Sequence, residues 1–503
     1  MSAHKLPVVY VRGFAATSSE IDDAVDDPLY GFNKGAVHVR IGSDDKPWFH
    51  QFEGPLLRLI SDERYQLLVH GDQRAFLLSQ EDAAVPEATV WIHRFYDQAA
   101  TTFGAEPAAF VLEDAAEDLF DFVKLVLTKT GAPRVFLVAH SMGGLICRSM
   151  IQRVIPLADG AADAATSYVD RLFTYGTPHS GIQFAHGFGL LEKLRDLFNI
   201  DAAAIFGPDR MYEYLTTDGG NRPNGWSPAD VPDGVFPKER IFCLVGTDSE
   251  DYAVARGLSS KLVGVRSDGL VQIDRAFVPG ANRALVHRSH SGRYGLVNSE
   301  EGYQNLRRFL FGDLRAQVDL VHVEPPPGSG DDGVIRQVEV QLAIRQLPVL
   351  VDERTSAHHC PIQFEPTPAE DPVLPLLVTF LTSRLPRPTD TLRYSLHLRL
   401  LSLAETGLEL ALDPANHLEQ TADFDDTLVV DVQPGNGDEQ PAQAWAVWNS
   451  ELPGAIRNWT PTGDPLPGDQ SGDGWMTEVA LPETANPLFG PTAAIRLTLT
   501  PWQ

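Results

Sequence analysis

A single serine stands where an apolar run of the sequence gives way to a helix-compatible stretch. The run Val135–Ala139 is strand-like, and His140-Ser141-Met142-Gly143-Gly144 follows it directly. Ala139 and Gly143, two positions before and after the serine, are small enough to let a strand and a helix approach closely. A sharp turn there would expose the Ser141 hydroxyl, and the amino terminus of the helix would stabilise negative charge beside it. Ser141 is therefore the candidate nucleophile.

The elements around this turn alternate between strand and helix patterns. Glu113–Thr130 carries apolar residues at helical spacing, with acidic residues early and Lys129 late. Gly131-Ala132-Pro133 then ends the helix before the strand that leads to the serine. This alternation predicts a mostly parallel sheet flanked by helices. The other expected strands of the sheet are Leu6–Val11, Thr89–His93, Val169–Tyr175 and Arg240–Asp248.

Two runs of residues resemble lipases of the α/β-hydrolase superfamily. The run from His140 to Arg148 resembles their nucleophile elbow, including that of small bacterial lipases whose elbow also begins with alanine. The run Gly176-Thr177-Pro178-His179-Ser180-Gly181 resembles the loop that lipases carry after the next strand. The resemblance covers residues 1–315 and implies an α/β-hydrolase fold with a serine, an aspartate and a histidine in that order along the chain.

The resemblance also points to the acid and the base. Asp268 lies in a Ser-Asp-Gly-Leu-Val run that resembles the acid motif of bacterial lipases, and Asp248 at the end of a strand is the alternative acid. His290 lies just before the last amphipathic helix, in the His-Ser-Gly setting of related hydrolases. His287 is the alternative base, and His179 a weaker one because the fold places the base last in the chain. We expect Ser141, Asp268 and His290 to form the triad.

The oxyanion hole is expected at the end of the first strand. Arg12-Gly13-Phe14 stands where lipases carry a His-Gly-x loop, so the resemblance assigns the backbone N–H groups of Phe14 and Met142 as the two donors. Arginine replaces the usual histidine of this loop. That departure keeps open a catalytically inactive scaffold as an alternative.

A long insertion separates the Gly-Thr-Pro run from the acid. Residues 182–238 contain helix-like apolar spacing between Leu190 and Phe198 and a tail rich in Gly, Asn and Pro. Insertions at this place in hydrolases often form a cap or lid over the site. An accessory helix pair that does not move is an equal alternative.

The composition changes after residue 315, and residues 316–503 predict a second, all-β domain. Short strands separated by Pro, Gly and Asp turns predict an antiparallel β-sandwich, and the segment resembles no family that we recognise. Its ligand or partner is unknown. Core packing is favoured over a binding face for five tryptophans, and solvated turns are favoured over calcium binding for four aspartates. These residues are Trp445, Trp448, Trp459, Trp475 and Trp502, and Asp423, Asp425, Asp426 and Asp431.

The composition limits the partners and the compartment. The chain has 503 residues and a formal charge of −28, so its surface should repel nucleic acid and anionic membranes. Cys147, Cys243 and Cys360 are too few for a disulfide framework and suit buried packing. No signal peptide or transmembrane run is visible, which predicts a cytoplasmic protein.

The sequence predicts a serine hydrolase that cleaves carboxylic esters, a lipase or an esterase acting on an acyl-ester or lipid substrate. No metal and no other cofactor is implied, since Ser141, His290 and Asp268 supply the chemistry. The alternatives are a deacylase of phospholipids or glycolipids, an acyltransferase on the same fold, and the inactive scaffold.

Overall fold

The structure is a computed structural model, and its description covers most of the chain. The described residues are 5–13, 39–41, 47–49, 54–69, 72–93, 95, 111–182, 203–249, 266–291, 295–324, 334–364, 373–384, 391–404, 422–435, 442–471 and 474–502. They divide into two compact units, residues 1–283 with 287–306, and residues 284–286 with 307–503. The domain limits expected from the sequence, 1–315 and 316–503, stay a prediction.

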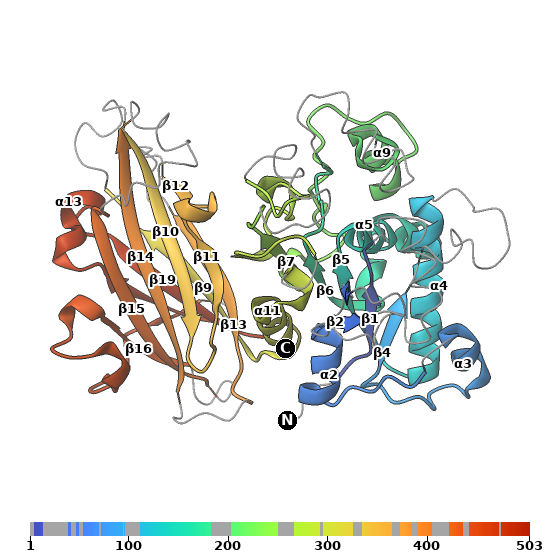
Figure 1. Ribbon diagram of the computed structural model, residues 1–503, viewed down its shortest axis with the longest axis horizontal. Helices are drawn as coiled ribbons and strands as arrows, with labels where there is room; N and C mark the ends of the chain where they lie inside the picture. The colour runs from blue at the N-terminus through green and yellow to red at the C-terminus, as the bar shows by residue number, and fades with distance from the viewer. Residues whose placement is uncertain are drawn as a thin grey trace. The chain divides into compact units, whose positions relative to one another are not determined.

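The first unit is built on the strands β4, β1, β5, β6 and β7 of a six-stranded sheet in the order β4-β1-β5-β6-β7-β8 (Figure 1). The pairs β1 with β4, β1 with β5, β5 with β6 and β6 with β7 are all parallel. Because parallel strands end at one edge, the residues that follow them meet there. The strands are β1 (Val8–Val11), β4 (Val90–His93), β5 (Val135–His140), β6 (Val169–Tyr175), β7 (Ile241–Gly246) and β8 (Asn282–Val286).

Helices cover both faces of this sheet, which confirms the predicted α/β class (Figure 1). Alternate strand residues such as Val9 and Leu137 pack with the long helix α4 and the elbow helix α5 in one core. Neighbouring residues point to the other face, where Tyr175 lies against Gly302 of α11. The helices are α2 (Gly54–Glu63), α3 (Gln73–Ser79), α4 (Leu112–Thr130), α5 (Met142–Ser149), α6 (Ile155–Asp159), α8 (Ala203–Phe206), α9 (Pro208–Leu215) and α11 (Glu300–Phe311).

The expected insertion is only partly described. Residues 183–202, which hold the predicted helix from Leu190 to Phe198, lie outside the described residues. The described remainder contains the short helices α8 and α9 and a run of turns up to β7. A separate two-stranded sheet pairs β2 (Val39–Ile41) with β3 (Pro47–Phe49).

The second unit consists of two antiparallel sheets, which confirms an additional β unit. One sheet has the order β11-β10-β14-β15-β16, with β12 also paired to β10, and the other has the order β13-β9-β19-β18-β17. Whether they form a sandwich stays a prediction. The strands are β9 (Leu314–Val321), β10 (Val334–Ile344), β11 (Leu350–Arg354), β12 (Ile362–Phe364), β13 (Leu374–Leu381), β14 (Leu392–Ala404), β15 (Phe424–Gln433), β16 (Gln443–Trp448), β17 (Asp469–Ser471), β18 (Gly474–Ala480) and β19 (Ala494–Pro501); the short helix α13 spans Asn486–Phe489.

The tryptophans of this unit serve mainly as packing residues. Trp448 and Trp475 lie in the hydrophobic core that residues of both sheets share, and Trp502 is also buried. Trp445 and Trp459 are half-buried. The Trp459 ring lies under the Arg393 guanidinium, 5.1 Å from the ring centre.

The acidic residues proposed as alternative calcium ligands contact other side chains. Asp431 is buried and accepts two hydrogen bonds from Arg393 at 2.7 and 2.6 Å. Asp425 accepts from His397 and Arg399, and Asp426 from Ser450. Within the described ranges, no group of three or more His, Cys, Asp or Glu side chains is arranged to hold a metal ion.

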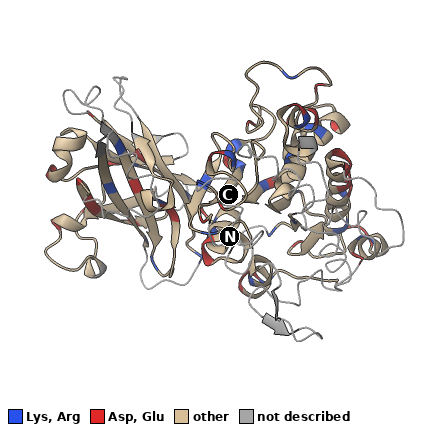
Figure 2. Ribbon diagram, turned by 45° about the horizontal axis from the view of Figure 1, so that its top comes forward, with Lys and Arg blue, Asp and Glu red and all other residues tan. Residues whose placement is uncertain are grey.

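Acidic and basic residues are interspersed along the helices and strands of each unit (Figure 2). Among the helices that the structure describes, none combines the length and the apolar character needed to cross a membrane. The apolar residues of Leu408–Leu412 predict a further strand of the second unit, and they lie outside the described residues.

Candidate active site

Ser141 occupies a strained turn between β5 and α5. Its backbone angles are φ 54° and ψ −127°, a region that residues with a Cβ atom rarely adopt. Its amide donates to the carbonyl of Tyr175 at 2.9 Å, and its own carbonyl accepts from the Thr177 hydroxyl at 2.9 Å. Both partners come from the end of β6 and the loop behind it. The neighbouring strand therefore fixes the backbone of the serine.

Two glycines after the serine make this turn possible. A Cβ atom on Gly143 would lie 2.4 Å from the carbonyl oxygen of Val11, and one on Gly144 would lie 2.2 Å from the Thr177 hydroxyl. Neither distance allows a side chain. The elbow helix can therefore pack against the end of β1 and against the loop after β6 only because these positions lack side chains.

The structure brings Ser141, His290 and Asp268 together. His290 Nε2 lies 3.0 Å from Ser141 Oγ, and His290 Nδ1 lies 2.8 Å from Asp268 Oδ2. Asp268 and His290 are both almost fully buried, with 1% and 2% of their surface exposed. These distances suit a chain of hydrogen bonds in which the aspartate orients the imidazole and the imidazole accepts the serine proton.

The loop around Asp268 accounts for the second oxygen of its carboxylate. Asp268 Oδ1 accepts from the amides of Leu270 and Val271 at 3.0 and 2.7 Å. Gly269, which lies between Asp268 and Leu270, has a φ of 93°, so the Asp-Gly turn needs its glycine. The Ser-Asp-Gly-Leu-Val run thus forms a turn that directs Oδ2 toward His290.

Glycines at the ends of β6 and β7 make room for the acid and the base. A Cβ on Gly176 would lie 3.0 Å from Asp268 Oδ2 and 3.1 Å from His290 Nδ1. A Cβ on Gly246 would lie 2.7 Å from that of Asp268. In the sequence, Gly176 stands out only as part of a motif, and Gly246 does not stand out. The signal for both is similar, a glycine at or near the carboxyl end of a predicted strand of the sheet.

The alternative acid and the alternative bases lie elsewhere. The Asp248 amide donates to the carbonyl of Arg288 at 3.3 Å, and the exposed His287 has its Nδ1 3.4 Å from the Thr247 hydroxyl. His179 is fully buried, with Nε2 3.1 Å from the Thr174 hydroxyl, and burial holds its pKa well below the ordinary value. These three side chains take part in none of the hydrogen bonds that join Ser141, His290 and Asp268.

The two expected oxyanion donors differ in how far the structure describes them. Met142 is the first residue of α5, so its amide belongs to the helix terminus beside Ser141. Phe14 lies outside the described residues, so its position stays a prediction. Gly13 before it is described and lies close to the elbow, since a Cβ there would be 3.1 Å from that of Ser141.

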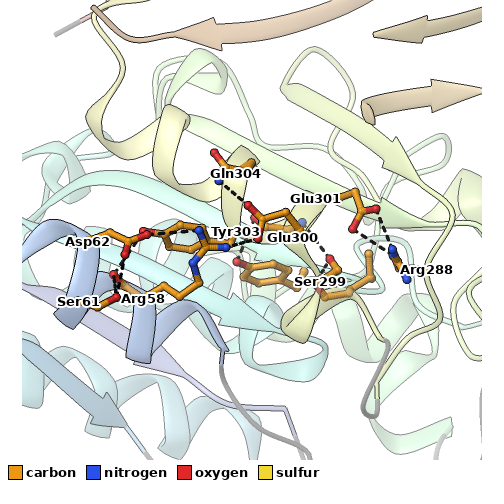
Figure 3. Close-up of polar contacts among 12 residues, drawn as sticks. Arg58, Ser61, Asp62, Arg288, Ser299, Glu300, Glu301, Tyr303 and Gln304 are labelled. Atoms are coloured by element: carbon orange, nitrogen blue, oxygen red, sulfur yellow. Dashed lines mark hydrogen bonds and ion pairs between the residues drawn. The ribbon is translucent and has the colours of Figure 1, made fainter. Parts of the chain in front are cut away.

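The loop that carries His290 is held by the start of α11. Arg288, two residues before His290, donates twice to the carboxylate of Glu301 at 3.1 and 2.9 Å (Figure 3). The neighbouring Glu300 pairs with Arg58 of α2, whose guanidinium lies over the Tyr303 ring at 3.8 Å. Figure 3 shows the side chains of Arg58 on α2 and of Glu300 and Tyr303 on α11 reaching toward one another. Glu301 of α11 therefore restrains the segment that leads to His290, and Arg58 of α2 is paired in turn with α11.

Arg148, at the end of the elbow helix, is a buried cation with only 1% of its surface exposed. It donates to the carbonyls of His179, Pro228 and Asp230 at 2.8–3.0 Å, and to Gln152 Oε1 at 2.8 Å. Burial lowers its pKa to about 10. The last part of the expected cap is thus tied to α5, the helix that follows Ser141.

The comparisons with known sequences confirm the predicted resemblance to lipases. No protein-family model matches the chain. Triacylglycerol lipases of Pseudarthrobacter phenanthrenivorans and Burkholderia plantarii are each 41% identical to it over 69 residues, which are 14% of this chain. The matches span 18% and 16% of those two lipases, less than a fifth of the length of either.

Three solved structures that match part of this chain are described as a lipase, an esterase and a phospholipase. A mature lipase of Bacillus licheniformis matches 61% of this chain and 92% of its own at 16% identity, with a TM-score of 0.33. A naproxen esterase of Bacillus subtilis matches 62% and 84% at 12% identity, with a TM-score of 0.24. A phospholipase of Legionella pneumophila matches 83% and 91% at 11% identity, with a TM-score of 0.31. All three TM-scores lie below 0.5, so these similarities do not support a function for this chain.

Proposed function

We propose that this protein is a serine hydrolase of the α/β-hydrolase fold that cleaves carboxylic esters through an acyl-enzyme. The observation that carries the proposal is the pair of hydrogen bonds on the His290 ring, 3.0 Å to Ser141 Oγ and 2.8 Å to Asp268 Oδ2. A nucleophile, a base and an orienting acid joined in this way are the parts needed for acyl transfer.

In the proposed reaction, Ser141 Oγ attacks the acyl carbon of the ester while its proton passes to His290 Nε2. Asp268 keeps the proton of His290 on Nδ1 and stabilises the imidazolium. The carbonyl oxygen becomes an oxyanion, which the Met142 amide, and that of Phe14 as the sequence predicts, would stabilise by hydrogen bonds.

The tetrahedral intermediate then collapses, and the C–O bond to the alcohol breaks as His290 Nε2 returns the proton to the leaving oxygen. Water attacks the acyl-serine by the same route in reverse. The proton of the water goes to His290 and then to Ser141, which releases the carboxylic acid.

The first test is hydrolysis of p-nitrophenyl esters from short to long acyl chains, combined with fluorophosphonate labelling. We expect the wild type to be active and labelled, and Ser141→Ala to lose both. Ser149→Ala is the matched control, because Ser149 is a fully buried serine of the same helix. Labelling of the Ser141→Ala variant at the wild-type rate would disprove the nucleophile.

The chain-length profile distinguishes an esterase from a lipase. Phosphatidylcholine vesicles and a competing alcohol in the same assay test the deacylase and acyltransferase alternatives. A correctly folded wild type that is neither active nor labelled would favour the inactive scaffold.

A further inference from the structure

The residue before the candidate nucleophile reaches the candidate base directly. His140 Nε2 lies 3.1 Å from the backbone carbonyl oxygen of His290, and the two rings are 5.0 Å apart. A carbonyl oxygen only accepts hydrogen bonds, so Nε2 carries the proton and donates. His140 and Ser141 thus contact His290 at two points, its backbone and its ring.

This contact fixes the second backbone group of His290. The amide of His290 already donates to the carbonyl of Asp268 at 2.8 Å. With the bond from His140, both the N–H and the C=O of His290 have partners, one in the acid turn and one at the end of β5. A residue whose peptide groups are held on both sides has little freedom to displace its ring.

The imidazole of His140 is neutral. Burial is the largest cause, and the neighbouring His290 ring and Arg12 act in the same direction. Together they lower the pKa of His140 to about 3, although the hydrogen bond to the His290 carbonyl acts to raise it. A neutral ring donates through Nε2 without placing a second positive charge beside the imidazolium that forms on His290 during catalysis.

The His140 ring is also confined on its other edge. A Cβ atom on Gly13 would lie 2.7 Å from His140 Nδ1. The loop at the end of β1 therefore packs directly against the ring. The ring lies between that loop and the backbone of the base.

We propose that His140 is a positioning residue, whose hydrogen bond to the His290 carbonyl keeps His290 Nε2 within reach of Ser141 Oγ. The inference rests on the proposed function, because it assigns His140 a role only if His290 is the base. His140 exchanges no proton in the reaction.

Three variants test this role in the full-length chain. Gln places its amide nitrogen close to the position of His Nε2, whereas Asn ends near the position of Nδ1 and Leu has no donor. We expect His140→Asn and His140→Leu to lower kcat for a p-nitrophenyl ester roughly 10–100-fold with little change in KM, and His140→Gln to stay within a few-fold of the wild type.

The rate of fluorophosphonate labelling should fall in parallel with kcat, because attack by Ser141 needs the same base. A merely structural role would be filled equally well by Asn and Gln, so equal rates in these two variants would overturn the inference while the wild type remained active. A wild type without labelling at Ser141 would overturn the proposed function itself. Because Asn and Gln differ by one methylene, their comparison holds even if the Leu variant does not fold.

Discussion

Asp268 and His290 are joined twice, once through their side chains and once through their backbones. His290 Nδ1 lies 2.8 Å from Asp268 Oδ2, and the His290 amide donates to the Asp268 carbonyl, also at 2.8 Å. The two residues are 22 positions apart in the chain. The double link fixes the ring plane relative to the carboxylate, so a change in one side chain need not move the other residue.

This double link makes Asp268→Asn a sharp test of the acid. The Asn oxygen can keep the bonds from the Leu270 and Val271 amides, which turns its NH2 group toward His290 Nδ1. Nδ1 must then accept, so Nε2 holds the proton and cannot take one from Ser141. We expect kcat to fall by about 10⁴-fold at a nearly unchanged melting temperature.

The pH dependence of the residual rate provides the control for that variant. If hydroxide replaces the lost base, the residual rate of Asp268→Asn should keep rising with pH above the plateau of the wild type. An Asp268→Asn variant that keeps a tenth or more of the wild-type kcat would rule out Asp268 as the acid and direct attention to Asp248.

Substitution of Gly143 by alanine should damage both the fold and the activity. The added Cβ would lie 2.4 Å from the Val11 carbonyl and 2.7 Å from that of Arg12, so β1 or α5 must shift. Overpacking of this kind costs about 1–3 kcal/mol of unfolding free energy. Gly219→Ala, where a Cβ meets no atom within 4 Å, is the control and should change neither urea stability nor ester hydrolysis. Equal stability of the two variants would contradict the close approach at the elbow.

Buried histidines should make the first unit sensitive to acid. Burial lowers the pKa of His179 well below 6.5 in the folded state, whereas the unfolded chain takes up a proton near pH 6.5. The unfolded state then binds more protons, so stability is retained above pH 6.5 and lost below it, by about 1.4 kcal/mol per pH unit. His93, with a pKa of about 4, acts in the same direction.

His179→Gln separates this effect from other acid-sensitive groups. Between pH 6.5 and 5, the slope of the unfolding free energy against pH should be smaller in the variant than in the wild type, by about 1.4 kcal/mol per pH unit, which corresponds to one proton. Above pH 7 the slopes of variant and wild type should coincide. Parallel lines over the whole range would mean that His179 is already protonated in the folded protein.

Arg148→Met should loosen the end of the expected cap. The methionine leaves the carbonyls of His179, Pro228 and Asp230 without this donor, at a cost of about 1–3 kcal/mol for each group that stays buried and unsatisfied. Hydrogen exchange should increase in residues 215–235. Arg153→Met, the same change a few residues further along the chain, is the control. Unchanged exchange in the Arg148 variant would show that other contacts hold this segment.

The sequence was most informative where local pattern determines structure. The predicted strand Val169–Tyr175 coincides with β6, and the predicted helix Glu113–Thr130 differs from α4 by one residue. The turn at Ser141 could be predicted because Ala139, Gly143 and Gly144 are small residues at positions where neighbouring elements approach closely. Each of these features depends on residues close together in the chain.

Contacts between residues that are far apart in the chain could not be predicted from the local sequence pattern. Nothing in the local pattern separates Asp268 from Asp248, and the preference came from a motif resemblance. The bond from His140 to the His290 carbonyl joins residues 150 positions apart, so only the fold shows it. Short or polar strands also went unrecognised, such as β11 with its Asp-Glu-Arg end and β17 with three polar residues.

The backbone of Ser141 has a consequence for the evolution of this fold. A non-glycine residue at φ 54° and ψ −127° costs about 1–3 kcal/mol, and glycine would adopt these angles without that strain. Ser141→Gly should therefore melt at a higher temperature than the wild type. Selection for heat resistance alone would therefore favour glycine at this position, and the proposed role of Ser141 as a nucleophile gives a reason for the serine.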